Sequence, residues 1–370
     1  MKGKMMKNLD KKEWAEFSLN EIFTVDAGKR LENRNKIPGK HPFIGATDNG
    51  NGVTGFVGNE NSSKDKNVLG VNYNGAPCIA FYHPYECVFT DDVKRLHLIN
   101  HADTSDILLY FISIFAQQRT KYTYGYKFKE QRMYRQKLML PVTDSGEPDY
   151  EYMSEYIQEN RKAMLAKYRA YVKNRIAELG EYVEIPALSE KEWKAIPIVK
   201  IFERFDPGKG HGLNHLAQVP LGINYIGATN RNNGVLCSVA RTKETSGLIQ
   251  EGNCIGFIKN GDGAAGFAIY KRERFISTSD VIYGYASWLN LSTGLFFVAA
   301  QDMIEKKYSH GYKRNQQHLR GDKVMLPVTD SGEPDYGYME QYAKNMMIRK
   351  YRQYLSFLDA KDKTETVQGR

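Results

Sequence analysis

The sequence has little of what membrane, disulfide-bonded and zinc-binding proteins need. No apolar run reaches the roughly 20 residues that cross a bilayer, and the best candidate, residues 289–300, indicates a buried helix. The N-terminus is basic and lacks the apolar core of a secretory signal peptide. The four cysteines form no Cys-x-x-Cys pair, and none lies at zinc-ligand spacing with a histidine. We therefore expect a cytoplasmic protein with reduced cysteines, no bound metal and no membrane association.

The sequence also lacks the short motifs of enzymes that modify or cut DNA. It contains no Asn/Asp-Pro-Pro-aromatic tetrapeptide, no glycine motif suited to S-adenosylmethionine, and no nuclease-like Pro-Asp followed by Asp/Glu-x-Lys. The glycine-rich stretches at 43–53 and 225–235 have neither GxGxxG nor GxxxxGK(S/T) spacing. A strand that leads into a tight loop is therefore favoured over a phosphate-binding loop. We predict no catalytic residue and no cofactor in this chain.

What the sequence does have is an internal repeat. The twelve residues 139–150 read MLPVTDSGEPDY, and residues 325–336 repeat all twelve, 186 positions later. Other matches follow in the same order: FIGATDNGNGV at 43–53 with YIGATNRNNGV at 225–235, and GYK at 125–127 with GYK at 311–313. Chance does not repeat twelve residues in a 370-residue chain, so the protein is a tandem duplication. Two similar halves suit a partner that presents two sites, and double-stranded DNA is the obvious one.

The repeat predicts the fold class and the domains. Short strands broken by glycine and asparagine, with apolar helical stretches, indicate an α+β fold of two tandem mixed α/β domains with pseudo-two-fold symmetry. A long helix is expected after each domain. The expected limits are 1–148 for the first domain, 149–182 for a central helical spacer, 183–334 for the second domain, and 335–370 for the C-terminal helix and tail. The interiors, 29–69 and 209–252, agree only at framework positions, which is typical of two modules that do one job on different targets.

The charge of the chain favours a polyanionic partner. Its net charge is +9, and basic residues gather with aromatic residues at 119–137 and 306–323. Lysine and arginine contact phosphates, whereas Asn, Gln and Arg can read base edges. The turns near residues 48 and 230 are second candidates, and a merely solvated basic face is the alternative. The predicted DNA-contacting residues are Thr47, Asn49, Lys127, Lys129, Arg132, Thr229, Arg231, Asn232, Lys313, Arg314, Asn315 and Gln317.

A long helix should begin after each copy of the repeated segment. Pro148 and Pro334 suit the start of a helix, and the acidic residues that follow them favour the helix dipole. A heptad-like apolar stripe follows, interrupted by Arg175 in the first copy. We predict that the two helices pack together, although each could instead pack only on its own domain. The residues expected in this packing are Leu165, Tyr168, Val172, Leu179, Met347, Tyr351, Tyr354 and Leu358.

These motifs, in this order, resemble the specificity (S) subunit of Type I restriction-modification systems and the similar specificity subunits of Type IIB systems. The resemblance covers about residues 14–358. It implies that each half is a target-recognition domain that reads one half of a bipartite DNA sequence. It further implies that helices at about 149–179 and 335–360 pair as an antiparallel coiled coil, set the spacing between half-sites and dock methyltransferase subunits. Those subunits would carry S-adenosylmethionine, a restriction subunit could join them, and the specificity subunit itself would not be catalytic.

Two other functions stay open on the sequence alone. The chain could be a non-enzymatic protein-interaction scaffold whose tyrosine-rich faces, drawn from 25 tyrosines, bind another protein. The missing motifs disfavour the other alternative, a divergent DNA methyltransferase or nuclease. Under the leading hypothesis, Arg231→Ala or Arg314→Ala should alter recognition of one half-site and spare the other.

Overall fold

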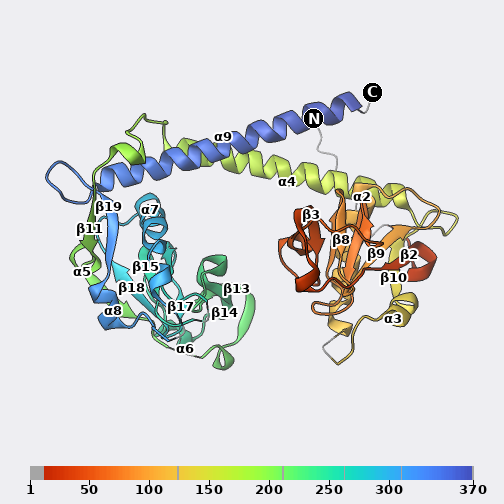
Figure 1. Ribbon diagram of the computed structural model, residues 1–370, viewed down its shortest axis with the longest axis horizontal. Coiled ribbons are helices and arrows are strands. Elements are labelled where there is room, and N and C mark those ends of the chain that lie inside the picture. Colours follow the sequence, from red (N-terminus) through yellow and green to blue (C-terminus); the bar gives the residue numbers. More distant parts are fainter. Residues whose placement is uncertain (1–11, 123–124, 211, 262, 310, 369–370) are drawn as a thin grey trace. The chain divides into compact units, whose positions relative to one another are not determined.

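The computed structural model describes residues 12–122, 125–210, 212–261, 263–309 and 311–368, and the chain divides into two compact units (Figure 1). Unit 1 comprises the residues up to Arg169, and unit 2 comprises those from Ala170 onward. Each unit is a mixed α/β domain built from small sheets and short helices, as the sequence predicts. No helix among the described residues is long and apolar enough to cross a membrane.

Unit 1 contains two four-stranded sheets and a separate two-stranded one, in the orders β2-β9-β6-β7, β4-β3-β8-β5 and β1-β10. Neighbouring strands are antiparallel except for β3 and β8, which are parallel. The strands are β1 (Trp14–Ser18), β2 (Phe23–Ala27), β3 (Pro38–Ile44), β4 (Val53–Val57), β5 (Lys64–Asp65), β6 (Val68–Asn72), β7 (Ala80–His83), β8 (Cys87–Phe89), β9 (Val93–Leu98) and β10 (Lys137–Pro141). The helices are α1 (Leu19–Ile22), α2 (Ser105–Gln118), α3 (Glu130–Arg135) and α4 (Tyr150–Leu179), with 3-10 turns η2 (Asn33–Asn35), η3 (Gly50–Gly52) and η4 (Arg119–Lys121).

Unit 2 repeats this element order. Its sheets are β12-β18-β15-β16, β14-β13-β17 and β11-β19, and the parallel pair recurs as β13 and β17. In the described part of unit 2, α6 (Lys243–Ser246) stands where unit 1 has β5. The strands are β11 (Trp193–Pro197), β12 (Arg204–Pro207), β13 (Gln218–Ile226), β14 (Val235–Val239), β15 (Cys254–Ile258), β16 (Ala268–Lys271), β17 (Ile276–Ser277), β18 (Val281–Tyr285) and β19 (Lys323–Pro327). The helices are α5 (Ile198–Ile201), α6, α7 (Leu291–Asp302), α8 (Gln316–Gly321) and α9 (Tyr336–Gln368), with 3-10 turns η5 (Leu188–Glu190), η6 (Leu213–His215), η7 (Arg231–Gly234) and η8 (Glu305–Lys307).

An apolar helix provides the main core of each unit. In unit 1, Phe111 and Phe115 of α2 are fully buried, and the Phe111 ring meets Phe23 of β2 edge-on at 4.7 Å between centroids. In unit 2, Phe297 of α7 is fully buried and contacts Phe257 of β15 in the same edge-on way. The apolar stretches that the sequence predicts as buried helices therefore occupy equivalent places in the two units.

The duplicated segment forms the same turn and the same helix start twice. The Thr143 N–H donates to Glu147 O over 2.8 Å, and the Thr329 N–H donates to Glu333 O over 2.9 Å. Gly146 and Gly332 lie in the left-handed region, with φ of 81° and 83°. Glycine adopts this conformation without the steric cost that other residues bear.

An aspartate after this turn caps each long helix. The carboxylate of Asp149 accepts the Tyr152 N–H at 2.9 Å, and that of Asp335 accepts the Tyr338 N–H at 2.9 Å. The same carboxylates pair with lysines near the beginning of each unit, Lys12 at 2.7 Å and Lys191 at 2.9 Å. The predicted helices are thus confirmed, and α9 continues to Gln368, beyond the expected Ala360.

Within unit 2, the last turns of α4 pack against α9 in antiparallel order. The Tyr171 and Tyr351 rings lie 6.4 Å apart. Further along, the Asn345 amide accepts the Val183 N–H at 3.2 Å and donates to Val183 O at 2.6 Å. The Tyr338 hydroxyl then donates to Pro186 O at 2.9 Å. Residue numbers therefore rise along α4 and the segment after it while they fall along α9. The expected antiparallel helix pairing is present in this unit.

The apolar residues predicted to pack between the two long helices are partly confirmed, and one of them is shifted by one position. Val172 and Leu179 are buried, and so is Leu358. Leu165, Tyr168 and Tyr351 are partly exposed, and Tyr354 is exposed. At the start of the second stripe, Ile348 is the fully buried residue, whereas the expected Met347 is only partly buried and lines a groove described below. Arg175, the interruption in the stripe, is accommodated by an ion pair with Glu178.

We expect Asp335→Ala to lower the free energy of unfolding of unit 2 by about 1–2 kcal/mol, because it removes a helix cap and the partner of Lys191. Burial raises the pKa of Asp335, but hydrogen bonds from Lys191 and the Tyr338 N–H outweigh it and leave that pKa lowered. A lowered folded-state pKa stabilises the protein above the ordinary pKa of aspartate and is lost as the pH falls through the folded-state value. Urea unfolding at neutral and acid pH, followed by tryptophan fluorescence, should show the difference narrowing in acid. Asp330→Ala, an exposed aspartate in the same turn, is the control and should change stability little.

Candidate nucleic-acid interface

Each unit carries the same glycine loop, residues 45–52 in unit 1 and residues 227–234 in unit 2. The loop is closed by the Gly45 N–H donating to Gly52 O at 2.9 Å, and by the Gly227 N–H donating to Gly234 O at 2.9 Å. Inside it a threonine hydroxyl accepts the N–H two residues on, at 3.3 Å from Asn49 to Thr47 and 3.1 Å from Arg231 to Thr229. Thr47 and Thr229 therefore brace the loop, whatever else their partly exposed side chains do.

The far side of the glycine loop turns through left-handed backbone. In unit 1, Gly50, Asn51 and Gly52 have φ of 58°, 53° and 76°; in unit 2, the equivalent residues Asn232, Asn233 and Gly234 have 47°, 48° and 79°. Asparagine and glycine are the residues that tolerate this region best. The Asn51 amide donates to Tyr82 O at 3.4 Å, and the Asn233 amide donates to Tyr270 O at 3.0 Å. Each loop is thus fastened to the neighbouring strand, β7 or β16.

A second loop supports the glycine loop in unit 1. We call the Tyr73–Gly75 segment and its counterpart Lys259–Gly261 the Asn-Gly loops. The Asn74 amide donates to the Asp92 carboxylate at 2.8 Å. A Cβ on Gly75 would lie 2.7 Å from Ala46 O, so this loop passes directly under the glycine loop.

Unit 2 uses the same support. The Asn260 amide donates to the Asp280 carboxylate at 3.3 Å, and a Cβ on Gly261 would lie 2.4 Å from Ala228 O. The sequence analysis missed this element, although its signal was available: an Asn-Gly pair recurs at the same place in both halves.

The basic segment of each half adjoins the Asn-Gly loop. The Phe128 N–H donates to Tyr73 O at 3.2 Å, and the equivalent Arg314 N–H donates to Lys259 O at 3.1 Å. In unit 1, the Arg119 guanidinium also lies 3.9 Å from the Asp48 carboxylate of the glycine loop. The two sets of predicted residues, from the glycine loops and from the basic segments, therefore flank the same Asn-Gly loop at the surface of each unit.

Most of the predicted contact residues lie on that surface. Asn49, Lys129, Arg231, Asn232, Lys313, Asn315 and Gln317 are exposed, and Thr47, Lys127, Arg132 and Thr229 are partly exposed. Arg132 is held in place, because its guanidinium lies 3.7 Å from the Tyr126 ring centroid and donates to Lys127 O at 2.7 Å. Asn315 caps α8 by accepting the His318 N–H at 2.8 Å.

Arg314 is the exception and corrects the sequence-based interpretation. Its side chain is 0% exposed and sits inside unit 2. Its guanidinium donates to the Asp322 carboxylate at 2.8 Å, to Gln301 at 2.6 Å and to Gly266 O at 3.1 Å. A buried, ion-paired arginine cannot reach a base edge, so Arg314 has a structural role. Unit 1 has Phe128 at the equivalent position.

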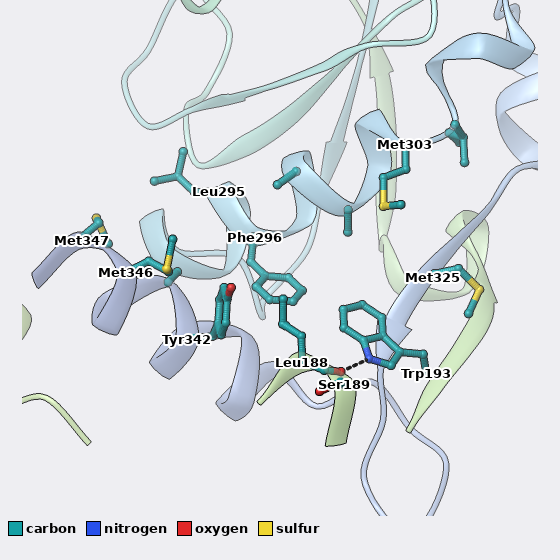
Figure 2. Close-up of a pocket in the computed structure, with 14 residues that line it drawn as sticks. Leu188, Ser189, Trp193, Leu295, Phe296, Met303, Met325, Tyr342, Met346 and Met347 are labelled. Atoms are coloured by element: carbon teal, nitrogen blue, oxygen red, sulfur yellow. Dashed lines mark hydrogen bonds between the residues drawn. The ribbon is translucent and has the colours of Figure 1, made fainter. Parts of the chain in front are cut away.

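One face of unit 2 carries an apolar groove of about 820 Å³ between α7, α9 and β19 (Figure 2). Trp193 forms one wall, and its indole N–H donates to Leu188 O at 2.8 Å. Met303 and Met325 are exposed by 82% and 46%. Unit 1 has polar residues at three of the four methionine positions of the groove: Gln117 for Met303, Asn160 for Met346 and Arg161 for Met347. The fourth, Met325, is kept as Met139 in the repeat. Most of the methionines of the groove are therefore particular to unit 2.

Neither a metal site nor an activated thiol is found in the described ranges. No three His, Cys, Asp or Glu side chains there are grouped to hold a metal ion. Burial raises the pKa of Cys78, Cys87 and Cys254 to about 12, which keeps these thiols protonated near neutral pH. Burial also lowers the pKa of His83 to about 4.

Comparison with known proteins finds matches to the first half of the chain. Residues 11–167 match the family model of the Type I restriction modification DNA specificity domain. The Type II restriction enzyme BgcI specificity subunit S.BcgI of Heyndrickxia coagulans is 44% identical over 162 residues, which cover 44% of this chain and 48% of that protein. The chain thus aligns with about half the length of this curated relative.

Solved structures give a weaker likeness over more of the chain. The S subunit of a Type I restriction-modification system from M. genitalium has a TM-score of 0.49 at 15% identity, over 95% of this chain and 93% of that one. The HsdS subunit from Thermoanaerobacter tengcongensis has a TM-score of 0.30 at 11% identity, over 94% and 91%.

We expect Arg314→Ala to destabilise unit 2 by about 3 kcal/mol, the lower end of the range for breaking a buried ion pair, because Asp322 loses its buried partner and keeps only the half-exposed Lys307. Replacing Gln301, Arg314 and Asp322 together by Phe, Phe and Gln, the residues at the equivalent positions of unit 1, should restore much of the loss. Urea unfolding of the full chain measures both variants. An Arg314→Ala protein of unchanged stability but altered base preference would contradict the structural role.

Met303→Gln should leave the stability of unit 2 within about 0.5 kcal/mol, because the side chain is largely exposed and unit 1 already has glutamine there. Contiguous exposed apolar surface promotes association. The variant should therefore self-associate less than the wild type in sedimentation velocity at matched concentration. Leu221→Gln, which changes an isolated residue that is 93% exposed, is the matched control. Equal effects from the two substitutions would show that the groove has no special role.

Proposed function

We propose, from the match of residues 11–167 to the Type I restriction modification DNA specificity domain, that the chain is the DNA-sequence-specificity subunit of a restriction-modification complex. Each unit would bind one half of a bipartite DNA target. The long helices would set the distance between the half-sites and dock methyltransferase subunits. Double-stranded DNA and those subunits are the proposed partners, and a restriction subunit could join them.

The two units share the same arrangement of loops, and this observation supports extending the proposal from the matched half to the whole chain. In both units the Asn-Gly loop lies directly against the glycine loop and accepts a backbone hydrogen bond from the basic segment. The side chains exposed on that scaffold differ, with Asp48 and Asn49 in unit 1 and Asn230 and Arg231 in unit 2. A shared scaffold with different exposed groups is what two readers of two different DNA sequences require.

The chemistry of modification would come from the partners. We propose that this chain is not catalytic and binds no cofactor, and that the methyltransferase subunits carry S-adenosylmethionine and act on a flipped adenine. Burial raises the pKa of Cys78 and Cys87, so neither thiol is an activated nucleophile. A cytoplasmic location belongs to the same proposal, since the subunit would work on DNA together with those partners.

The proposal is tested by sequencing the methylated bases of DNA from a host that expresses this chain with a methyltransferase subunit encoded beside it. A bipartite motif with two unlike halves is the expected result. Absence of any new motif, with the methyltransferase shown to be active through another specificity subunit, would remove the proposal.

A protein-interaction scaffold remains the second candidate, and the apolar groove of unit 2 is the observation that favours it. The two functions differ in their response to salt. Binding through phosphate contacts weakens steeply as salt rises, because counterions are released from the DNA. Fluorescence anisotropy of a labelled duplex, measured between about 50 and 200 mM salt, decides between them. Affinity that is absent or independent of salt would favour the scaffold.

Arg231→Ala should weaken recognition of the half-site read by unit 2 by about 1–3 kcal/mol and leave the other half-site unchanged. Arg231 is exposed at the tip of the glycine loop, where β13 turns into β14. Arg241→Ala is the matched control, because Arg241 is exposed just beyond the opposite end of β14. Competition binding with duplexes mutated in one half-site at a time measures the effect. Uniform weakening across all duplexes would instead assign Arg231 to the DNA backbone.

A further inference from the structure

The inference concerns the tips of the two glycine loops, and it rests on the proposed function. The loops read GATDNGNGV at 45–53 and GATNRNNGV at 227–235. They differ at only three adjacent positions, residues 48–50 against residues 230–232. The side chains that brace both loops are identical, namely the threonine at 47 and 229 and the asparagine at 51 and 233. The two glycines that close each loop are also identical.

The three differing residues are all exposed in both loops. At the third of these positions the backbone is shared, because Gly50 and Asn232 both lie in the left-handed region with φ of 58° and 47°. The 3-10 turn begins at Gly50 in unit 1 and one equivalent position earlier, at Arg231, in unit 2. Nothing lies within 4 Å of the point where a Cβ on Gly50 would stand, so the unit 1 loop has room for the unit 2 residue. The two loops therefore differ only at exposed residues. These differences change the chemical groups that the loop offers to a partner, and they leave its supporting contacts unchanged.

The presented groups differ in their hydrogen-bonding pattern. Asn49 has an amide with donors and an acceptor, whereas the equivalent Arg231 has a guanidinium with donors only. Paired with DNA bases in the major groove, arginine matches the two acceptors of guanine, and asparagine matches the acceptor and donor of adenine. In unit 1, the Asp48 carboxylate accepts from the Asn49 amide at 2.7 Å and lies near Arg119, which orients the asparagine.

The geometry points to Asn49 and Arg231 as specificity-determining residues at equivalent positions: Arg231 selects a guanine in the half-site of unit 2, and Asn49 selects an adenine in the half-site of unit 1. The two loops are interchangeable readers on one scaffold. Exchange of the three tip residues should therefore transfer the preference for one base pair, and leave the rest of the target unchanged.

The test is the exchange Asp48→Asn, Asn49→Arg and Gly50→Asn in the full chain, studied in complex with its methyltransferase subunit. Methylated-base sequencing should show the half-site of unit 1 altered at one or two adjacent positions, with a guanine gained. The half-site of unit 2 and the spacer should stay as in the wild type. Competition binding with duplexes changed one base pair at a time should show a roughly 10- to 100-fold shift in preference at the same position.

Two controls keep the result interpretable. Lys40→Ala changes an exposed basic residue of β3, the strand that leads into the same loop, and should leave the motif unchanged. The thermal unfolding temperature of the triple variant should match that of the wild type. If the triple variant is less stable, the single variant Asn49→Arg is tested in its place.

The outcomes separate the inference from the function on which it rests. A wild-type complex that methylates a bipartite motif, with an exchanged protein that methylates the same motif, would overturn the inference and leave the function standing. If methylation is lost, the duplex competition decides: relaxed preference at one position supports base readout, and equal weakening on every duplex overturns it. A wild-type complex without any bipartite motif would instead remove the function itself.

Discussion

The capping aspartates, Asp149 and Asp335, are the constraint on which each half depends. Each carboxylate holds the first turn of a long helix and pairs with a lysine that precedes the first strand of the unit. That first strand pairs with the last one, β1 with β10 and β11 with β19. The beginning of the unit, its end and the following helix therefore meet at one ionic contact. Charge-assisted hydrogen bonds of this kind fix the geometry of the groups that they join and also stabilise them. The long helix therefore begins in the same way in both units.

The interiors of the two units differ at one equivalent place, which is apolar in unit 1 and holds a buried ion pair in unit 2. The shared fold tolerates both because several neighbouring residues differ together. In unit 1 the Tyr122 hydroxyl donates to Gln136 at 2.8 Å, and Phe115 and Phe128 fill the space beside it. In unit 2 the Tyr308 hydroxyl donates to Asp322 at 2.7 Å, and the neighbouring places hold Gln301 and Arg314. An arginine alone among apolar residues would be costly, as would an unpaired aspartate. The pair with its glutamine is tolerated because each charge has its partner.

Much of this structure could be predicted from the sequence, and the failures have physical reasons. The repeat gave two equivalent units, and proline and acidic residues placed the starts of α4 and α9 close to where they lie. Arg314 was misread because a lone sequence does not show which arginines are buried. The available signal was Asp322 eight residues later, at a position where the other half has an uncharged glutamine. Choosing Ile348 over Met347 for the helix contact required the partner surface, since both residues are apolar. The parallel pairs β3-β8 and β13-β17 join distant segments, and local patterns carry no signal for them.

Under the proposed function, the separation of supporting residues from exposed residues would let each glycine loop change its DNA target without loss of the fold. In the glycine loop, the supporting bonds run through backbone atoms, a threonine hydroxyl and an asparagine amide, while the tip residues point outward. Substitution at an exposed tip generally costs well under 1 kcal/mol of stability. The same substitution can change base preference by 1–3 kcal/mol, roughly the value of a bidentate contact. Selection can therefore move the recognised sequence while the stability of the domain stays nearly constant. The divergence between the two halves falls where this asymmetry is greatest.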